Sequence, residues 1–185
     1  QLVTTASDSV RLRLDVVEVD VERFLADATA VLDAHRHGEP PDVDALDALV
    51  RSHRGEALPD EPHAEWAAAM RDEVRTCYIA LARLLAAEAD LAGDHLRAAA
   101  AHRRVLDADP YDEHSSLGIV STFDHMGAHG QADAAYATYL RRMDELGVPA
   151  APDPRSPLLS SRCLAPPVLG HEGATYARPA SDKEP

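Results

Sequence analysis

The sequence contains few aromatic residues, which limits how a hydrophobic core can be built. Phe, Trp and Tyr together account for only 4% of the 185 residues, whereas apolar residues as a whole account for 45%. The core must therefore consist mainly of Ala, Leu and Val. Ala is the best helix former, and small side chains allow helix backbones to approach closely. This composition favours tightly packed helix pairs over a sheet sandwich.

Cysteines and long apolar runs are also scarce. Cys77 and Cys163 lie far apart in segments of different composition. A disulfide is possible but not indicated, and the usage fits reduced thiols of a cytoplasmic protein. No apolar run is as long as a membrane span, and no signal peptide is visible. Because the chain starts at Gln1 rather than at Met, we expect it to be a piece of a longer protein.

Basic residues are outnumbered by acidic ones. The chain has 18 Lys and Arg against 32 Asp and Glu, which gives a formal net charge of -14. Binding to phosphate is driven by Lys and Arg that displace counterions, so an acidic surface repels a duplex. We expect no direct nucleic-acid binding by this chain, although a basic domain elsewhere in a longer protein could bind DNA.

The N-terminal segment shows a strand pattern. Apolar and polar residues alternate, with Val10, Leu12 and Leu14 on one face. One or two strands are unstable alone. Residues 1–19 are therefore predicted to be an arm that packs on the helices, or the edge of a preceding domain.

Helical periodicity begins after this arm. Apolar spacing predicts one helix from Asp20, its N-cap, to Gly38 and a second, shorter helix from about Asp42. A third, long helix starts near Ala64 and ends around Gly93.

Two residues stand out on the apolar stripe of the long helix. Trp66, the only tryptophan, is expected to be a core anchor, and the alternative is an exposed residue that dominates an interface. Cys77 shares the stripe and is expected to be a small buried apolar residue.

The rest of the helical region repeats itself. The shift that superposes Gly93 on Gly127 equals the period of the tetratricopeptide helical hairpin, which is about 34 residues. Glycine allows the left-handed backbone that such turns need. With residues 20–53 as a degenerate earlier unit, we predict an all-α, tetratricopeptide-like stack over residues 20–148. The positions expected to define the repeat core are Gly93, Ala98, His102, Leu106, Gly127, Ala132, Tyr136 and Leu140.

The composition changes again near the C-terminus. Eight of the thirteen prolines lie in residues 149–185, mixed with Ser, Ala and Gly. This mixture is typical of an extended or disordered tail.

Several separated motifs occur in a recognisable order. They are VDVERFLADA from Val19, HRGEALPDEPHAEWAAAMRDEV from His53, DPYDE at 109–113, the segment 127–136 and the segment 140–148. Over about residues 19–148 the chain resembles the bacterial transcriptional activator domain of SARP-type actinobacterial regulators.

The resemblance implies a non-catalytic module that activates transcription by contacting RNA polymerase, a sigma factor or a second protomer. In such regulators it follows a winged-helix DNA-binding domain, and Leu2 to Leu14 is similar to the last wing hairpin of that domain. After Pro149 the family's closing helix is replaced by the Pro-rich tail. An alternative interpretation is an adaptor or sensor module of a larger signalling protein, such as a regulatory ATPase.

No motif for catalysis or for a cofactor is present. The sequence has no phosphate-binding glycine loop, no nucleophile elbow and no zincin motif. His125 and His129 are separated by Gly127 at an expected helix end, and no Cys or carboxylate stands at a zinc-like spacing. We therefore expect no enzyme activity, no cofactor and no metal.

A partner surface is expected instead. In a tetratricopeptide-like stack the first helix of each pair lines the concave face, so its polar residues are candidates for binding a protein. The alternative is an ordinary solvated helix face. The candidate groove residues are Arg83, Asp90, His114, Ser121, Asp124 and His125.

Overall fold

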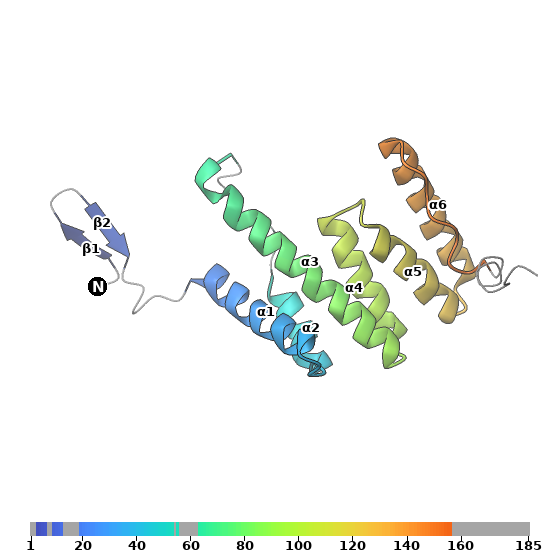
Figure 1. Cartoon of the computed structure of the whole chain (residues 1–185), viewed down its shortest axis with the longest axis horizontal. Helices are drawn as coiled ribbons and strands as arrows, with labels where there is room; N and C mark the ends of the chain where they lie inside the picture. Colours follow the sequence, from blue (N-terminus) through green and yellow to red (C-terminus); the bar gives the residue numbers. More distant parts are fainter. Residues whose placement is uncertain (1–2, 7–8, 13–18, 54, 56–62, 157–185) are drawn as a thin grey trace, which may run out of the picture. The chain divides into compact units, whose positions relative to one another are not determined.

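The computed structural model of the chain describes residues 3–6, 9–12, 19–53, 55 and 63–156. In this part six α-helices pack in sequential pairs (Figure 1). None of these helices is both long and apolar enough to cross a membrane. The helices are α1 (Asp20–Arg36), α2 (Val43–Ser52), α3 (Ala68–Leu91), α4 (His95–Ala108), α5 (Glu113–His125) and α6 (His129–Leu146), with a 3-10 turn, η1 (Glu65–Ala67), before α3.

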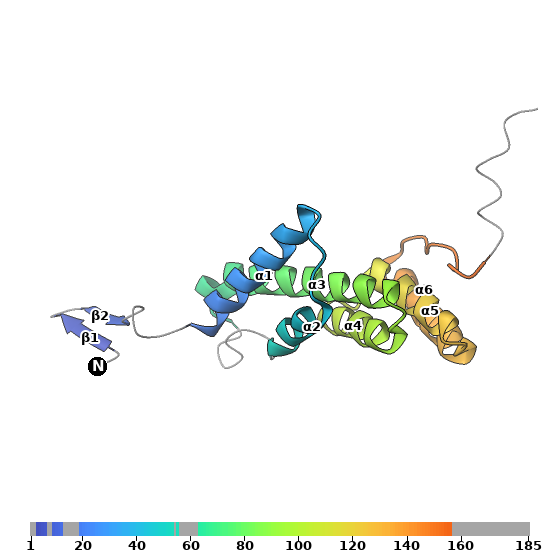
Figure 2. The same ribbon diagram turned by 90° about the horizontal axis from the view of Figure 1, so that it is seen from below.

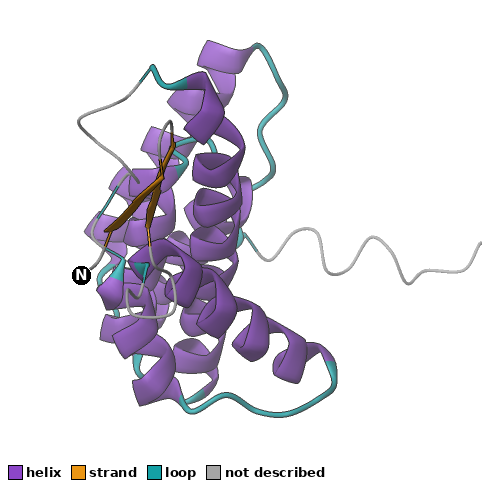
Figure 3. Ribbon diagram, turned by 90° about the vertical axis from the view of Figure 1, so that its left-hand side faces the viewer, coloured by secondary structure: helices purple, strands orange, loops and turns teal. Residues whose placement is uncertain are grey.

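Two short strands precede the helices. β1 (Val3–Ala6) and β2 (Ser9–Leu12) are the two strands in Figure 3. They pair antiparallel, and Val3 lies opposite Leu12. Leu2 and Leu14, the two ends of the wing-like segment, lie outside the described residues.

Aspartate side chains start three of the helices. The carboxylate of Asp42 accepts hydrogen bonds from the backbone N–H groups of Asp44 and Ala45 at the start of α2. Asp94 and Asp112 cap α4 and α5 in the same way. The expected N-cap at Asp20 is wrong by one residue. Val19 has the extended backbone of an N-cap, and Asp20 is already helical, where its negative charge still suits the helix dipole.

The long helix α3 is the centre of the packing. It packs on α1, α2 and α4, and Figure 2 shows α1 and α2 on different sides of it. Leu81 and Leu85 are fully buried in a cluster shared by these four helices. Ala82, Ala86 and Ala89 are also fully buried, so small residues allow the helices to approach closely.

A buried carboxylate joins α2 to α4. Asp47 is 4% exposed, and it accepts hydrogen bonds from Arg51 at 3.1 Å and from Arg104 of α4 at 3.2 Å. Burial alone would raise the pKa of Asp47, but the two arginines outweigh it and hold that pKa below its ordinary value. The charged form of Asp47 therefore anchors α2 on α4.

The turn between α3 and α4 and the turn between α5 and α6 have the same backbone hydrogen bonds, position by position. Gly93 has φ +77° and Gly127 has φ +68°. Just after each glycine, a backbone N–H donates across the turn to a helix carbonyl at 2.8 Å, in the pairs Asp94 to Ala89 and Ala128 to Phe123. The shift that superposes the two glycines also superposes the end of α3 on the end of α5, and the start of α4 on the start of α6.

Three of the eight expected repeat positions, Ala98, His102 and Ala132, are buried, but Leu140 is not. Ala98 and Ala132 are fully buried, whereas Leu140 is 41% exposed, so its assignment to the core is wrong. Leu106, one period earlier, packs against the cluster formed by α5 and α6. In the part of the chain that the structure describes, no further helix pair follows α6 to cover Leu140.

The assignment of Trp66 to the core is also wrong. Trp66 is 75% exposed, and the neighbouring Ala67 is fully buried instead. Trp66 lies in η1, where about three residues make a turn, so the period that aligns the stripe of α3 does not reach it. Cys77 is half-buried against the cluster shared by α1, α2, α3 and α4. Burial raises the pKa of its thiol, and the charge of Glu73 adds to this shift.

The start of the Pro-rich segment packs against α6. The Tyr136 hydroxyl donates to the carbonyl of Ala151 at 2.9 Å, and the Ala151 N–H donates to the Tyr139 hydroxyl at 2.7 Å. Arg155 donates to Asp133 at 2.8 Å. Residues 157–185 of the expected tail lie outside the described residues.

Candidate functional site

The candidate groove residues come from α3 and α5, and Arg83 serves to join these helices. Its guanidinium pairs with the carboxylate of Asp112, which is 5% exposed. The other carboxylate oxygen of Asp112 accepts from the Ser115 N–H at 2.7 Å and so caps α5. Arg83 therefore fixes the start of α5 on α3, and only part of its side chain is open to a partner.

Asp90 has a similar bridging position. One carboxylate oxygen, Oδ2, accepts a hydrogen bond from the Thr122 hydroxyl of α5 at 3.0 Å. The other, Oδ1, lies 3.0 Å from Nδ1 of His95 at the start of α4. Asp90 thus connects three helices, which sequence spacing alone did not indicate.

The other four candidates belong to α5 and are more accessible. His114 and His125 are exposed. The Ser121 hydroxyl donates back to the Leu117 carbonyl, and Asp124 lies 2.9 Å from Nδ1 of His129. At about 100° per residue, His114, Ser121 and His125 fall within about 40° of one another on the helix surface. They form one polar strip along α5, here named the α5 polar strip.

A buried histidine lies beneath this strip. His102 of α4 is 4% exposed, and its Nε2 lies 4.0 Å from Oδ2 of Asp90. Burial lowers the pKa of His102 to about 4, although the charge of Asp90 opposes this shift and His114 adds to it. The imidazole is therefore neutral near pH 7. Its ring occupies the space where a side chain at Gly118 would stand, because a Cβ atom there would lie 2.3 Å from Cε1 of His102.

The opposite side of α5 borders a cleft that the sequence analysis missed. The cleft is lined by α4, α5 and α6, is here named the α4–α6 cleft, and has a volume of about 490 Å³. Ile119 and Phe123 of α5 and Tyr139 of α6 are buried along it. On the helix surface, Ile119 and Phe123 lie about 140–180° from His114. The cleft and the α5 polar strip are thus separate surfaces.

Two arginines give the α4–α6 cleft a positive rim. The guanidinium carbon of Arg103 lies 5.2 Å from the centroid of the Phe123 ring, and Arg142 of α6 also lines the cleft. Among the described residues neither arginine has an acidic partner, although Asp107 also lines the cleft. A sequence signal existed, because Arg103 precedes Leu106, and Arg142 follows Tyr139, by nearly one helical turn. On a helix this spacing puts each arginine beside an apolar neighbour.

A second hollow of about 630 Å³ is lined by α3, by α4 and by His53 and Gly55, which follow the end of α2. His53 lines it and is held between two rings, with its centroid 5.3 Å from that of Phe24 and 4.4 Å from that of Tyr78. Burial lowers the pKa of His53. Residues 56–62, which follow this histidine closely in the chain, lie outside the described part, so we assign no ligand to this hollow.

Comparison with known proteins gave one match. The sequence model of the bacterial transcriptional activator domain matches residues 19–157. This range contains the six described helices, the α5 polar strip and the α4–α6 cleft. A search of curated proteins and a search of solved structures each found no match.

Proposed function

Because the chain belongs to the bacterial transcriptional activator domain family, we propose that it is the non-catalytic regulatory module of a SARP-type activator in the actinobacterial cytoplasm. It acts by contacting RNA polymerase or its sigma factor through protein surfaces, or by pairing with a second protomer. We take the helix pairs as a tetratricopeptide-like stack, which the matching turns at Gly93 and Gly127 support.

The α4–α6 cleft is the surface that best suits such a contact. Arg is enriched among residues that dominate protein interfaces, and two arginines line this cleft. Arg103 and Arg142 form its rim in a chain whose net charge is -14. We therefore propose that it binds a partner helix with an apolar face flanked by acidic side chains. The open rim arginines are the observation that carries this proposal.

The α5 polar strip is the alternative location for the partner. His114 and His125 are exposed there, but Arg83 and Asp90 are already used to hold α3 on α5. Because the polar strip has few apolar groups, a partner would bury less apolar area there than in the cleft. The groove residues expected from the sequence remain a prediction, and they belong to this second surface.

Capture of RNA polymerase holoenzyme by the immobilised full-length parent protein tests the proposal. The change Arg142→Glu should weaken capture at least tenfold, because it opposes acidic partner residues. Arg141→Glu is the matched control, since Arg141 is exposed on α6 but does not line the cleft. His114→Glu tests the polar strip.

Each result has a distinct meaning. Loss of capture with Arg142→Glu but not with Arg141→Glu supports the cleft. Loss with His114→Glu alone would move the partner to the α5 polar strip. Equal loss with Arg141→Glu would contradict a specific cleft contact. Sedimentation of the isolated chain identifies a second protomer as the partner if Arg142→Glu abolishes a dimer.

A further inference from the structure

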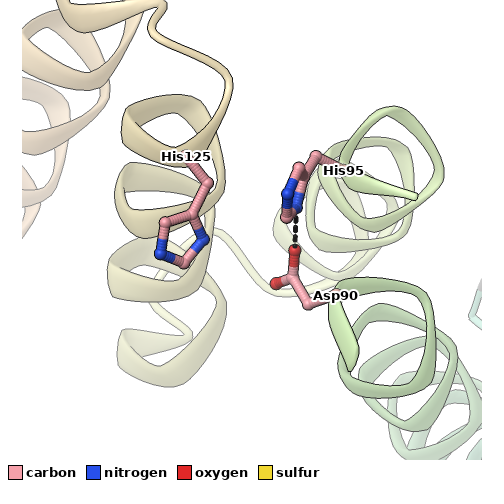
Figure 4. A group of neighbouring side chains, drawn as sticks. All are labelled: Asp90, His95 and His125. Atoms are coloured by element: carbon pink, nitrogen blue, oxygen red, sulfur yellow. Dashed lines mark hydrogen bonds and ion pairs between the residues drawn. The ribbon is translucent and has the colours of Figure 1, made fainter. Parts of the chain in front are cut away.

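Three potential metal ligands meet where α3, α4 and α5 come together. Figure 4 shows Asp90 at the end of α3, His95 at the start of α4 and His125 at the end of α5. Each offers one ligand atom, and these three atoms all lie within 4.8 Å of one another. No metal was expected from the sequence, because these residues are far apart along the chain and no ligand set stands at a zinc-like spacing. Here the ligands are brought together from three helices.

Two of the three ligand atoms already have the spacing expected around a bound ion. Two ligands of a tetrahedral ion at about 2.1 Å lie roughly 3.4 Å apart. Nδ1 of His95 and Oδ1 of Asp90 are already 3.0 Å apart. The rings of His95 and His125 have centroids 5.3 Å apart, and His125 is exposed at a helix end. To complete the ligand set, His125 would bring its ligand atom from within 4.8 Å to about 3.4 Å of the other two.

Asp90 is also oriented by a neighbouring side chain. Its second oxygen, Oδ2, lies 3.0 Å from the Thr122 hydroxyl, which shares its single proton with the Gly118 carbonyl at the same distance. The first oxygen, Oδ1, faces His95. Ligand carboxylates in metal sites are typically hydrogen-bonded in this way, which fixes their direction. Thr122 thus supplies to Asp90 the support that a metal ligand needs.

The His–Asp pair by itself has a simpler explanation. One period later Asp124 and His129 form the same pair at 2.9 Å across the next turn, so the pair braces the turn in both units. In the described residues only the first pair has a third ligand, His125, within reach. His125 takes the position that Leu91 holds in the earlier unit. The third ligand, rather than the pair, distinguishes this cluster.

We propose that Asp90, His95 and His125 bind one divalent transition-metal ion of the zinc type, with water in the remaining coordination position. Two imidazoles and one carboxylate suit zinc, nickel or copper, whereas calcium and magnesium prefer oxygen ligands throughout. The bound ion holds the end of α5 against the turn between α3 and α4. This inference does not depend on the proposed function, because ion binding involves no protein partner.

Calorimetric titration of the full chain with zinc chloride, after treatment with a chelator, tests the site. We expect one ion per chain and at least tenfold weaker binding for His125→Ala, whose exposed side chain can be removed without loss of the fold. His129→Ala is the matched control, because it removes the equivalent pair without a ligand of the cluster. It should bind zinc as tightly as the unchanged chain.

Thermal unfolding supplies a second measurement. Saturating zinc should raise the midpoint of the unchanged chain and of His129→Ala, but not that of His125→Ala, because an ion that binds only the folded state stabilises it. Equal zinc affinity in His125→Ala and the unchanged chain would overturn the proposal. So would equal losses in His125→Ala and His129→Ala, which would indicate scattered binding to surface histidines.

Discussion

The contact between Gly118 and His102 allows a sharp test of the packing between α4 and α5. In Gly118→Ala the new Cβ would lie 2.3 Å from Cε1 and 2.5 Å from Nε2 of the His102 ring. The His102 side chain is 4% exposed, so the surrounding atoms leave the ring little room to move aside. Overpacking of this kind costs about 1–3 kcal/mol.

The same substitution also removes a glycine from a helix, which by itself stabilises a protein. Replacing glycine by alanine in a helix contributes about 1 kcal/mol. Gly130 of α6 is the matched control, because a Cβ there would meet nothing within 4 Å. Gly130→Ala should therefore raise the free energy of unfolding, and Gly118→Ala should give a value about 1–3 kcal/mol lower than Gly130→Ala does.

Urea unfolding followed by far-UV circular dichroism measures both variants. A double-mutant cycle with His102→Ala then isolates the collision, because removing the ring should let Gly118→Ala stabilise as Gly130→Ala does. Equal stabilisation by Gly118→Ala and Gly130→Ala in the presence of His102 would refute the reasoning. A loss that persists in the His102→Ala background would show that another group causes the collision.

Three further predictions concern other parts of the domain. Burial lowers the pKa of His53, so the unfolded chain binds a proton at a higher pH than the folded chain does. The free energy of unfolding should therefore fall as pH drops below 6.5. Unfolding measured at several pH values should depend less on pH in His53→Gln than in the unchanged chain. Tyr136 is half-buried and bonded to Ala151, so Tyr136→Ala should cost about 3 kcal/mol and Tyr136→Phe about 1 kcal/mol in urea unfolding, and a cost near zero for both would contradict the packing of residues 149–156 on α6. Asp42→Ala should cost about 1 kcal/mol through loss of the N-cap of α2, measured in the same way, whereas Asp20→Ala should cost less because Asp20 is not the N-cap of α1.

The two matching turns were predictable because their signals are local. The left-handed turns require glycine at 93 and 127, and a turn of fixed length sets where the next helix begins. Apolar spacing likewise indicated α1, α2 and the long α3, whose bounds depend on a few neighbouring residues. The family followed from short motifs in a fixed order, and the match over residues 19–157 confirms it.

Exposure at the ends of elements was not predictable in this way. Trp66 and Leu140 have the spacing of core residues, but burial depends on which other segment covers them. Leu106 is covered by the next helix pair, whereas no described helix covers Leu140. A periodic pattern shows which face a residue occupies and leaves open whether anything lies against that face.

The sequence by itself determined the helices and the turns at Gly93 and Gly127, because these depend on backbone preferences and on spacing within a few turns. Only the tertiary structure decided which side chains meet. Asp90, His95 and His125 come together from three helices, and Arg103 and Arg142 flank a cleft lined by α4, α5 and α6. Distances between side chains on different helices depend on how the helices pack, and no spacing along the chain encodes them.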